Sequence, residues 1–208
     1  MSRANFDRAR ERDERIVDLA TRHVIAVRHV LDQFSCPQAA YRRVAKLRQR
    51  CRLRHLGTVQ LRGEGRPIDA YGNGFNVNGR QLAHEIYLTD FLLCYASLAE
   101  VVRDPSRVDQ RIHADAELTF RRSGRRFYIE LDTGTEDLTI VESKWKRDYR
   151  GVRDFLVVVT LSPVRLRHLI ERAGPVREIA LFATLGDVVA DPRGTVYCDA
   201  YGNAAALG

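Results

Sequence analysis

Four acidic residues near the middle of the chain alternate with apolar residues, in a pattern that could bind a metal ion. They are Asp115, Glu117, Glu130 and Asp132. Like charges that face each other across a sheet are destabilising, so such a cluster needs a cation, protonation or wide exposure to solvent. Mg²⁺, which prefers oxygen ligands and keeps several waters, would account for it, and so would Arg121 and Arg126 from the same face. The alternative is a strand face that is acidic and simply solvated.

Two short strands joined by a tight turn are expected to hold these carboxylates. Residues 115–121 (DAELTFR) and 126–132 (RFYIELD) both alternate, and the RSGR between them indicates a turn. We expect Ser123 and Gly124 to form a two-residue turn. Counting back from it gives two facing pairs of carboxylates, Glu117 with Glu130 and Asp115 with Asp132. The other face is apolar and belongs to the core.

Further helices and strands surround this pair. An apolar helical pattern covers residues 82–102 before it. After it come a helix that ends near Arg150, a β-branched strand at 155–161, a helix at 163–173 and a strand at 178–184. This alternation predicts an α/β domain whose mixed sheet is covered by helices on both faces. Lys144, at the edge of the first of these helices, would reach back toward the carboxylates or form a surface ion pair.

The positive charge lies at the other end of the chain. The 208 residues carry a net charge of +7, and residues 1–66 hold 16 Lys and Arg against 7 Asp and Glu. Residues 67–208 are slightly acidic, with 18 basic and 20 acidic residues. A basic module attached to an acidic body suggests a polyanionic partner, above all nucleic acid. A solvated basic surface is the alternative.

A helix-turn-helix module with a wing fits this basic region. Apolar residues at helical spacing predict two helices in residues 13–34, broken near Thr21–His23, and Pro37 suits the start of a third. The third helix has an apolar stripe that runs from Ala40 to Cys51, and residues 36–55 contain no acid. Its opposite side carries Arg42, Arg43, Lys46, Gln49 and Arg50. A Gly-rich hairpin follows, as expected for a wing.

This pattern favours binding to double-stranded DNA. The third helix would enter the major groove, where its basic residues contact phosphates or guanine edges, and wing residues Arg62 and Arg66 would touch the flanking backbone. DNA binding of this kind needs no cofactor. The alternative is a basic helix that serves protein contacts, oligomerisation such as a homodimer, or an adaptor role on an acidic protein or RNA.

Cysteine use and hydropathy exclude other classes. The four cysteines lie far apart and form no metal-binding or disulfide pattern. No apolar run approaches the roughly 18 residues that a membrane span requires. The polar N-terminus has no apolar signal core. We therefore expect a cytoplasmic protein with no membrane partner.

Several motifs resemble the replication-relaxation family of plasmids and mobile elements. They are the N-terminal helix-turn-helix, HEIYLTDFLLCY, HADAELTF, YIELDTGTE and KWKRDY, and they span about residues 13–160. The resemblance implies a winged helix-turn-helix domain at 1–75, followed by a restriction-endonuclease-like α/β domain at 82–208. It also implies a role in replication, DNA relaxation or their control, with replication or relaxase proteins as partners.

The second domain is similar to restriction-endonuclease-like enzymes, and this similarity implies a nuclease site. By that likeness Asp115 and Glu130 would hold Mg²⁺, and Glu85 would be the additional helix acid. Asp132 departs from the pattern because it stands where active members have lysine, which helps to orient the attacking water. Either Lys144 supplies the ammonium from the next helix, or the domain no longer cleaves DNA and acts as a scaffold. Whether the chain is an enzyme is left open.

Overall fold

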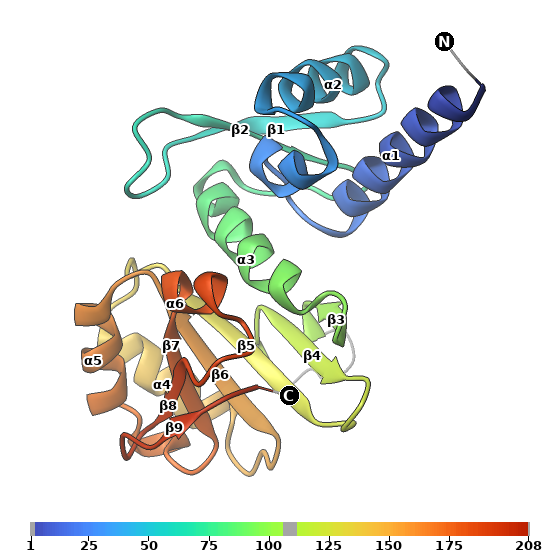
Figure 1. The fold of residues 1–208 in the computed structure, drawn as a ribbon. Coiled ribbons are helices and arrows are strands. Elements are labelled where there is room, and N and C mark those ends of the chain that lie inside the picture. Colours follow the sequence, from blue (N-terminus) through green and yellow to red (C-terminus); the bar gives the residue numbers. More distant parts are fainter. Residues whose placement is uncertain (1–2, 106–111, 208) are drawn as a thin grey trace. The chain divides into compact units, whose positions relative to one another are not determined.

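The computed structural model describes residues 3–105 and 112–207 (Figure 1). The chain forms two compact units, Met1–Thr89 and Asp90–Gly208, so the helix predicted to open the second domain contributes to both. Helices combine with a large mixed sheet, and the chain is of the α/β class, as predicted. None of the helices in the described ranges combines the length and apolar character that a bilayer span requires.

The first unit consists of helices followed by a two-stranded hairpin. Its elements are α1 (Arg3–Arg22), a 3₁₀ helix (Val27–Gln33), α2 (Pro37–Gln49), β1 (Arg54–Val59), β2 (Ile68–Gly72), a 3₁₀ helix (Gly79–Gln81) and the start of α3 (Leu82–Tyr95). The predicted break between the first two helices and the proline start of the third are confirmed.

The core of this unit is formed by the apolar stripes of its helices. Ala40, Val44 and Leu47 are the buried stripe of α2, and they pack with Ile16 and Ala20 of α1. Cys51, predicted to continue the stripe, is instead exposed, because α2 has already ended and Cys51 turns the chain with a positive φ of 55°.

The hairpin of the first unit is antiparallel. β1 and β2 pair from Arg54 with Gly72 to Val59 with Ile68. Ile25, between α1 and the 3₁₀ helix, adds a short antiparallel bridge to Tyr71, with two backbone hydrogen bonds of 2.8 Å. The bridge ties the hairpin to the helices in front of it.

The second unit is built around a seven-stranded sheet in the order β3-β4-β5-β6-β7-β8-β9. Its strands are β3 (Ala99–Arg103), β4 (Ala116–Phe120), β5 (Arg126–Asp132), β6 (Phe155–Thr160), β7 (Ala180–Thr184), β8 (Tyr197–Asp199) and β9 (Ala204–Ala205). The helices are α4 (Leu138–Asp148), α5 (Pro163–Glu171), a 3₁₀ turn (Gly174–Val176) and α6 (Leu185–Ala190). From β3 to β7, only β4 runs against the others.

The prediction of one long helix over 82–102 is wrong at its C-terminal end. α3 stops at Tyr95, and Ala99–Arg103 pair with β4 as an additional strand. Val101 and Leu118 are directly opposite each other in this pairing. The apolar residues of this stretch satisfy a strand as well as a helix, and tertiary pairing decides between them.

Helices cover both faces of the sheet. On one face, Trp145 and Tyr149 at the end of α4 and Leu169 of α5 pack against strand residues such as Val158 and Phe182. On the other face, aromatic rings connect α3 to the sheet: Tyr95 contacts Phe120 at 5.8 Å between centroids, and Phe120 contacts Phe127 at 5.4 Å. β5 is therefore a central strand with neither face open to solvent.

The expected register between β4 and β5 is wrong by two residues. Leu118 lies opposite Phe127 rather than Ile129, and Glu117 lies opposite Tyr128 rather than Glu130. The connection is longer than two residues: Phe120 and Arg125 close the loop, and Gly124 within it takes a φ of 68°. A shift by two preserves which face each side chain occupies, but it changes which carboxylates meet.

Candidate functional site

The corrected register brings Asp115 beside Glu130. The Asp115 backbone N–H donates to the Ile129 carbonyl at 2.9 Å, and Asp115 Oδ2 accepts a 2.7 Å hydrogen bond from the Leu131 N–H. Because these bonds go to the residues on either side of Glu130, Asp115 lies beside Glu130 on the neighbouring strand. The expected pairing of Asp115 with Asp132 is wrong, yet the two carboxylates that were predicted to share a metal are the two that meet.

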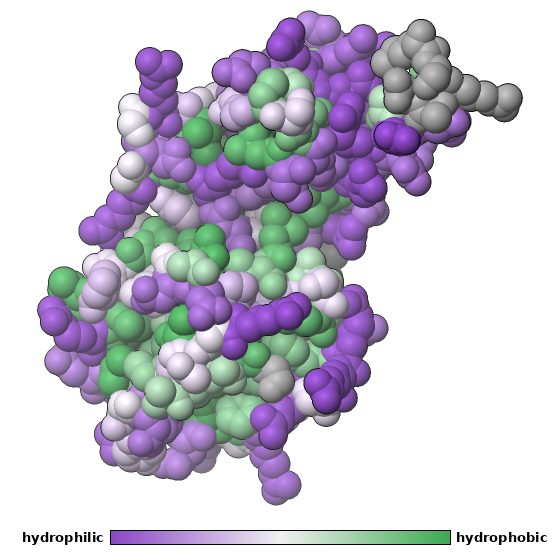
Figure 2. All heavy atoms as spheres, viewed as in Figure 1, coloured by the Kyte–Doolittle hydropathy of each residue, from purple (hydrophilic) through white to green (hydrophobic). Residues whose placement is uncertain are grey.

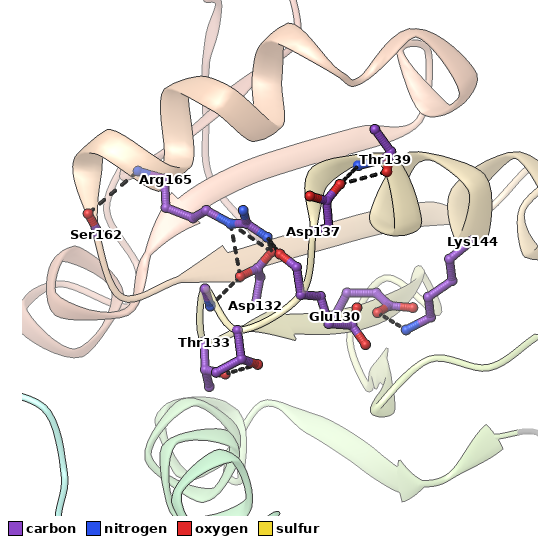
Figure 3. A network of polar contacts seen from close by, with 11 residues as sticks. Glu130, Asp132, Thr133, Asp137, Thr139, Lys144, Ser162 and Arg165 are labelled. Atoms are coloured by element: carbon purple, nitrogen blue, oxygen red, sulfur yellow. Dashed lines mark hydrogen bonds and ion pairs between the residues drawn. The ribbon is translucent and has the colours of Figure 1, made fainter.

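Glu130 is buried, and its two oxygens have separate partners. Oε2 accepts a 2.5 Å hydrogen bond from Lys144 Nζ (Figure 3). Oε1 accepts a 2.7 Å bond from the Tyr149 hydroxyl. Burial and the nearby Asp115 carboxylate raise the pKa of Glu130 to about 7. Burial lowers the pKa of Lys144, but the Glu130 carboxylate outweighs it and the net shift is upward. The prediction that Lys144 reaches back toward the carboxylates is confirmed.

The other two carboxylates are neutralised by arginines. Arg126 Nε lies 3.6 Å from Glu117 Oε1, as the sequence suggested. Arg121 does not join the cluster, since it donates to the carbonyls of Ala96 and Ser97. The fourth carboxylate, Asp132, has a partner that sequence reasoning did not identify.

Arg165 on α5 neutralises the carboxylate at the expected lysine position. Its Nη2 donates to Asp132 Oδ2 at 2.8 Å and to the Glu136 carbonyl at 2.7 Å, and its Nε lies 3.2 Å from both Asp132 oxygens (Figure 3). The fork geometry is typical of a structural arginine–carboxylate pair. Asp132 therefore helps to fix the start of α5 against the end of β5.

The structure does not assemble three metal ligands here. Within residues 3–105 and 112–207, no three His, Cys, Asp or Glu side chains lie close enough together to share a metal ion. Glu85 stands in the first turn of α3, in the first unit, with His84 Nδ1 3.9 Å from its carboxylate. Its role as a metal ligand stays a prediction.

Lys144 also borders a cavity on the outer side of α4. The cavity has a volume of about 390 Å³ and is lined by Glu136, Thr139, Ile140, Ser143, Lys144 and Arg147. Lys144 thus contacts a buried carboxylate and also lines a cavity that opens to solvent. Such a group can hold Glu130 in place, and it can also stabilise negative charge that arrives from the cavity side.

In the first unit, α2 presents an exposed basic face. Arg42, Lys46 and Arg50 are exposed, and the hydrophilic character of the unit extends over most of the surface seen in Figure 2. Other exposed residues of α2 also lie outside the predicted DNA contacts, among them Gln38, Tyr41 and Arg48. Their exposure could have been found from the helical spacing that identified the buried stripe.

Arg43, predicted as a DNA contact, is engaged within the protein. Its Nε donates to Asp13 Oδ1 at 2.5 Å and its Nη2 to Asp13 Oδ2. The Asp13 side chain is only 5% exposed and that of Arg43 22%. The pair fixes α2 against α1, so Arg43 is not available to DNA in the same way as its neighbours.

The hairpin loop supplies two more exposed arginines, Arg62 and Arg66. The loop is held by short contacts: Arg28 Nη1 lies 2.6 Å from Glu64 Oε1, and the Tyr87 hydroxyl accepts a 2.7 Å bond from the Arg62 N–H. The two arginines are thus presented by a loop whose backbone is restrained. The exposed basic residues of α2 and of this loop both belong to the first unit.

No protein-family model matches the chain, and no curated protein or solved structure is similar enough to indicate a relationship. The resemblance to the replication-relaxation family therefore stays a prediction. Function has to be inferred from the chemistry of the two sites.

Proposed function

We propose that the chain is a cytoplasmic protein that binds double-stranded DNA through α2 and the β1–β2 loop, in the manner of a winged helix-turn-helix. The observation that carries this proposal is the exposed face of α2, which bears basic and amide side chains in a stretch without acidic residues. The order of helix, bridge, helix, helix and hairpin supports it, because this order places a recognition helix beside a wing. A role in the replication or relaxation of a mobile element, with proteins of those processes as partners, rests on the family resemblance.

The salt dependence of binding tests this proposal. Five basic side chains are placed to meet phosphates: Lys46, Arg48, Arg50, Arg62 and Arg66. We expect the logarithm of the association constant for a labelled duplex to fall with the logarithm of salt concentration, with a slope of about −4 to −5. Fluorescence anisotropy at several salt concentrations measures it.

A triple alanine variant locates the contacts. Replacing Lys46, Arg48 and Arg50 is expected to reduce that slope by about three units, because three counterion releases are lost. The matched control replaces Arg122, Arg125 and Arg153, which are equally exposed but lie in the second unit. The proposal fails if both triple variants lose affinity equally, or if the wild type binds no duplex.

A metal-dependent DNA-nicking activity is the second candidate, favoured by Asp115 beside Glu130 with Lys144 attached. Proteins hold Mg²⁺ through one or two carboxylates and several waters, and Asp115 and Glu130 would be those carboxylates if the metal displaced Lys144 or Tyr149 from Glu130. When bound, the metal would neutralise charge on a phosphodiester. Lys144, at the edge of its cavity, would stabilise developing negative charge. Among β3 to β7 only β4 is reversed, which is consistent with the restriction-endonuclease-like fold, but fold alone does not establish function.

Nicking of supercoiled plasmid in Mg²⁺ or Mn²⁺ tests this candidate. Asp115→Asn keeps the acceptor for the Leu131 N–H but removes a charged ligand, and we expect it to lower the nicking rate by at least about 100-fold. Glu142→Gln, an exchange on the surface of α4, is the control and is expected to leave the rate unchanged. Equal nicking by Asp115→Asn and wild type, or nicking by neither, would reject the site.

A further inference from the structure

The exposed side chains of α2 fall into a central row and two flanks. At about 100° per residue, Gln38, Arg42 and Gln49 point within about 30° of the direction opposite to the buried stripe. Lys46 is displaced by about 50° to one side and Arg48 by about 110° to the other. A helix that enters a groove with its buried stripe turned away would direct the central row at the groove floor and the flanks at its two walls.

The chemistry of the row differs from that of the flanks. Lys46 and Arg48 on the flanks carry positive charge, which suits phosphates and carries no sequence information. The uncharged Tyr41 and Ala45 lie on the side of Arg48. The row carries two glutamines and one arginine, the side chains that make forked hydrogen bonds to adenine and guanine edges in the major groove. The N-terminal residues of a recognition helix make the base contacts. Gln38 and Arg42, in the first half of α2, meet that condition, whereas Gln49 is the last residue of the helix.

The backbone of α2 also orients Arg42. Its Nε donates to the Gln38 carbonyl at 3.3 Å, along the helix toward the N-terminal end. This contact engages Nε and leaves the terminal nitrogens to act as donors to a base edge. Gln38 and Arg42 lie four residues apart, so their Cα atoms are separated by about 6 Å along the axis, close to two base-pair steps.

We propose that Gln38 and Arg42 determine sequence preference by recognising an adenine and a guanine about two base pairs apart in the major groove, while Lys46 and Arg48 bind phosphates on the opposite strands. The proposal rests on the proposed function, since it assigns roles within the same DNA-binding surface. It names the class of DNA bound: duplexes that contain an A·T pair and a G·C pair at this spacing.

Selection from a pool of random duplexes with the full-length protein tests the proposal. The wild type is expected to enrich a motif with a G·C pair and, about two positions away, an A·T pair. Binding to the motif and to its single-base variants is then measured. We expect Arg42→Ala to remove the preference at the G·C pair, a loss of about 10- to 100-fold in discrimination, and Gln38→Ala to do the same at the A·T pair. Lys46→Ala should weaken binding to every sequence alike and reduce the salt slope by about one.

The outcomes separate this inference from the proposal on which it rests. Both side chains are exposed, so circular dichroism should show that the variants remain folded. If Arg42→Ala and Gln38→Ala weaken all duplexes uniformly and retain the wild-type motif, the assignment of bases is overturned while DNA binding stands. If the wild type enriches no duplex, DNA binding itself fails, and the assignment fails with it.

Discussion

Arg43→Met should lower the free energy of unfolding by about 3 kcal/mol, because it leaves the Asp13 carboxylate buried without its cation. Both oxygens of Asp13 accept hydrogen bonds from Arg43, and neither can reach bulk water easily once methionine replaces the guanidinium. Urea denaturation of the full-length protein, followed by circular dichroism, measures the change. Hydrogen exchange should place the loss of protection within residues 1–89.

Arg42→Met is the matched control for this change. Arg42 precedes Arg43 on the same helix but is exposed, so the same exchange should cost no more than about 0.5 kcal/mol. Asp13→Asn combined with Arg43→Met should recover part of the loss, since an amide is cheaper to bury unpaired than a carboxylate. Equal destabilisation by Arg42→Met and Arg43→Met would contradict a structural role for Arg43.

Arg42 and Arg43 show which features of α2 the sequence predicts and which it does not. The spacing of Ala40, Val44 and Leu47 predicts which side of the helix is buried, and this was confirmed. The difference between Arg42 and Arg43 depends on Asp13, which lies 30 residues earlier and on another helix. No local pattern indicates a tertiary ion pair, so the sequence alone predicts that both arginines contact DNA.

In the strands around the acidic cluster, the sequence likewise predicts one feature, the faces, and not another, the register. Alternation predicts the faces of β4 and β5, and a register error of two residues leaves those faces unchanged. The meeting of Asp115 with Glu130 depends on the length of the loop, which RSGR does not determine. The partner of Asp132 could not be foreseen for the same reason as that of Arg43, because Arg165 lies 33 residues further along the chain.

Lys144→Met should destabilise the protein by about 1 kcal/mol more at pH 8 than at pH 5, because its effect on Glu130 titration grows only above the wild-type pKa of about 7. Without Lys144, the Glu130 carboxylate would be buried beside Asp115 with no cation, which favours its protonated form. In the wild type the pKa of Glu130 is already raised to about 7, and removing Lys144 raises it further. The folded variant therefore binds a proton that the unfolded chain, with an ordinary glutamate pKa near 4.3, releases. The contribution of Glu130 to the stability of the variant is therefore complete below a pH of about 4.3. It is lost as the pH rises through the raised pKa of the folded variant, beyond about 7.

Urea denaturation at intervals between pH 5 and pH 8 measures this dependence, and two further variants isolate its cause. Lys146→Met exchanges an exposed lysine of the same helix, and its effect should be small at every pH. Lys144→Met combined with Glu130→Gln removes the group that titrates, so the difference between pH 5 and pH 8 should largely disappear. A loss for Lys144→Met that is the same at both pH values would mean that packing of the lysine chain, rather than its charge on Glu130, stabilises the fold. A loss that grows with pH and is abolished by Glu130→Gln would show that Lys144 compensates the charge of a buried carboxylate. A ligand bound in the adjacent cavity would then compete with Glu130 for the same ammonium group.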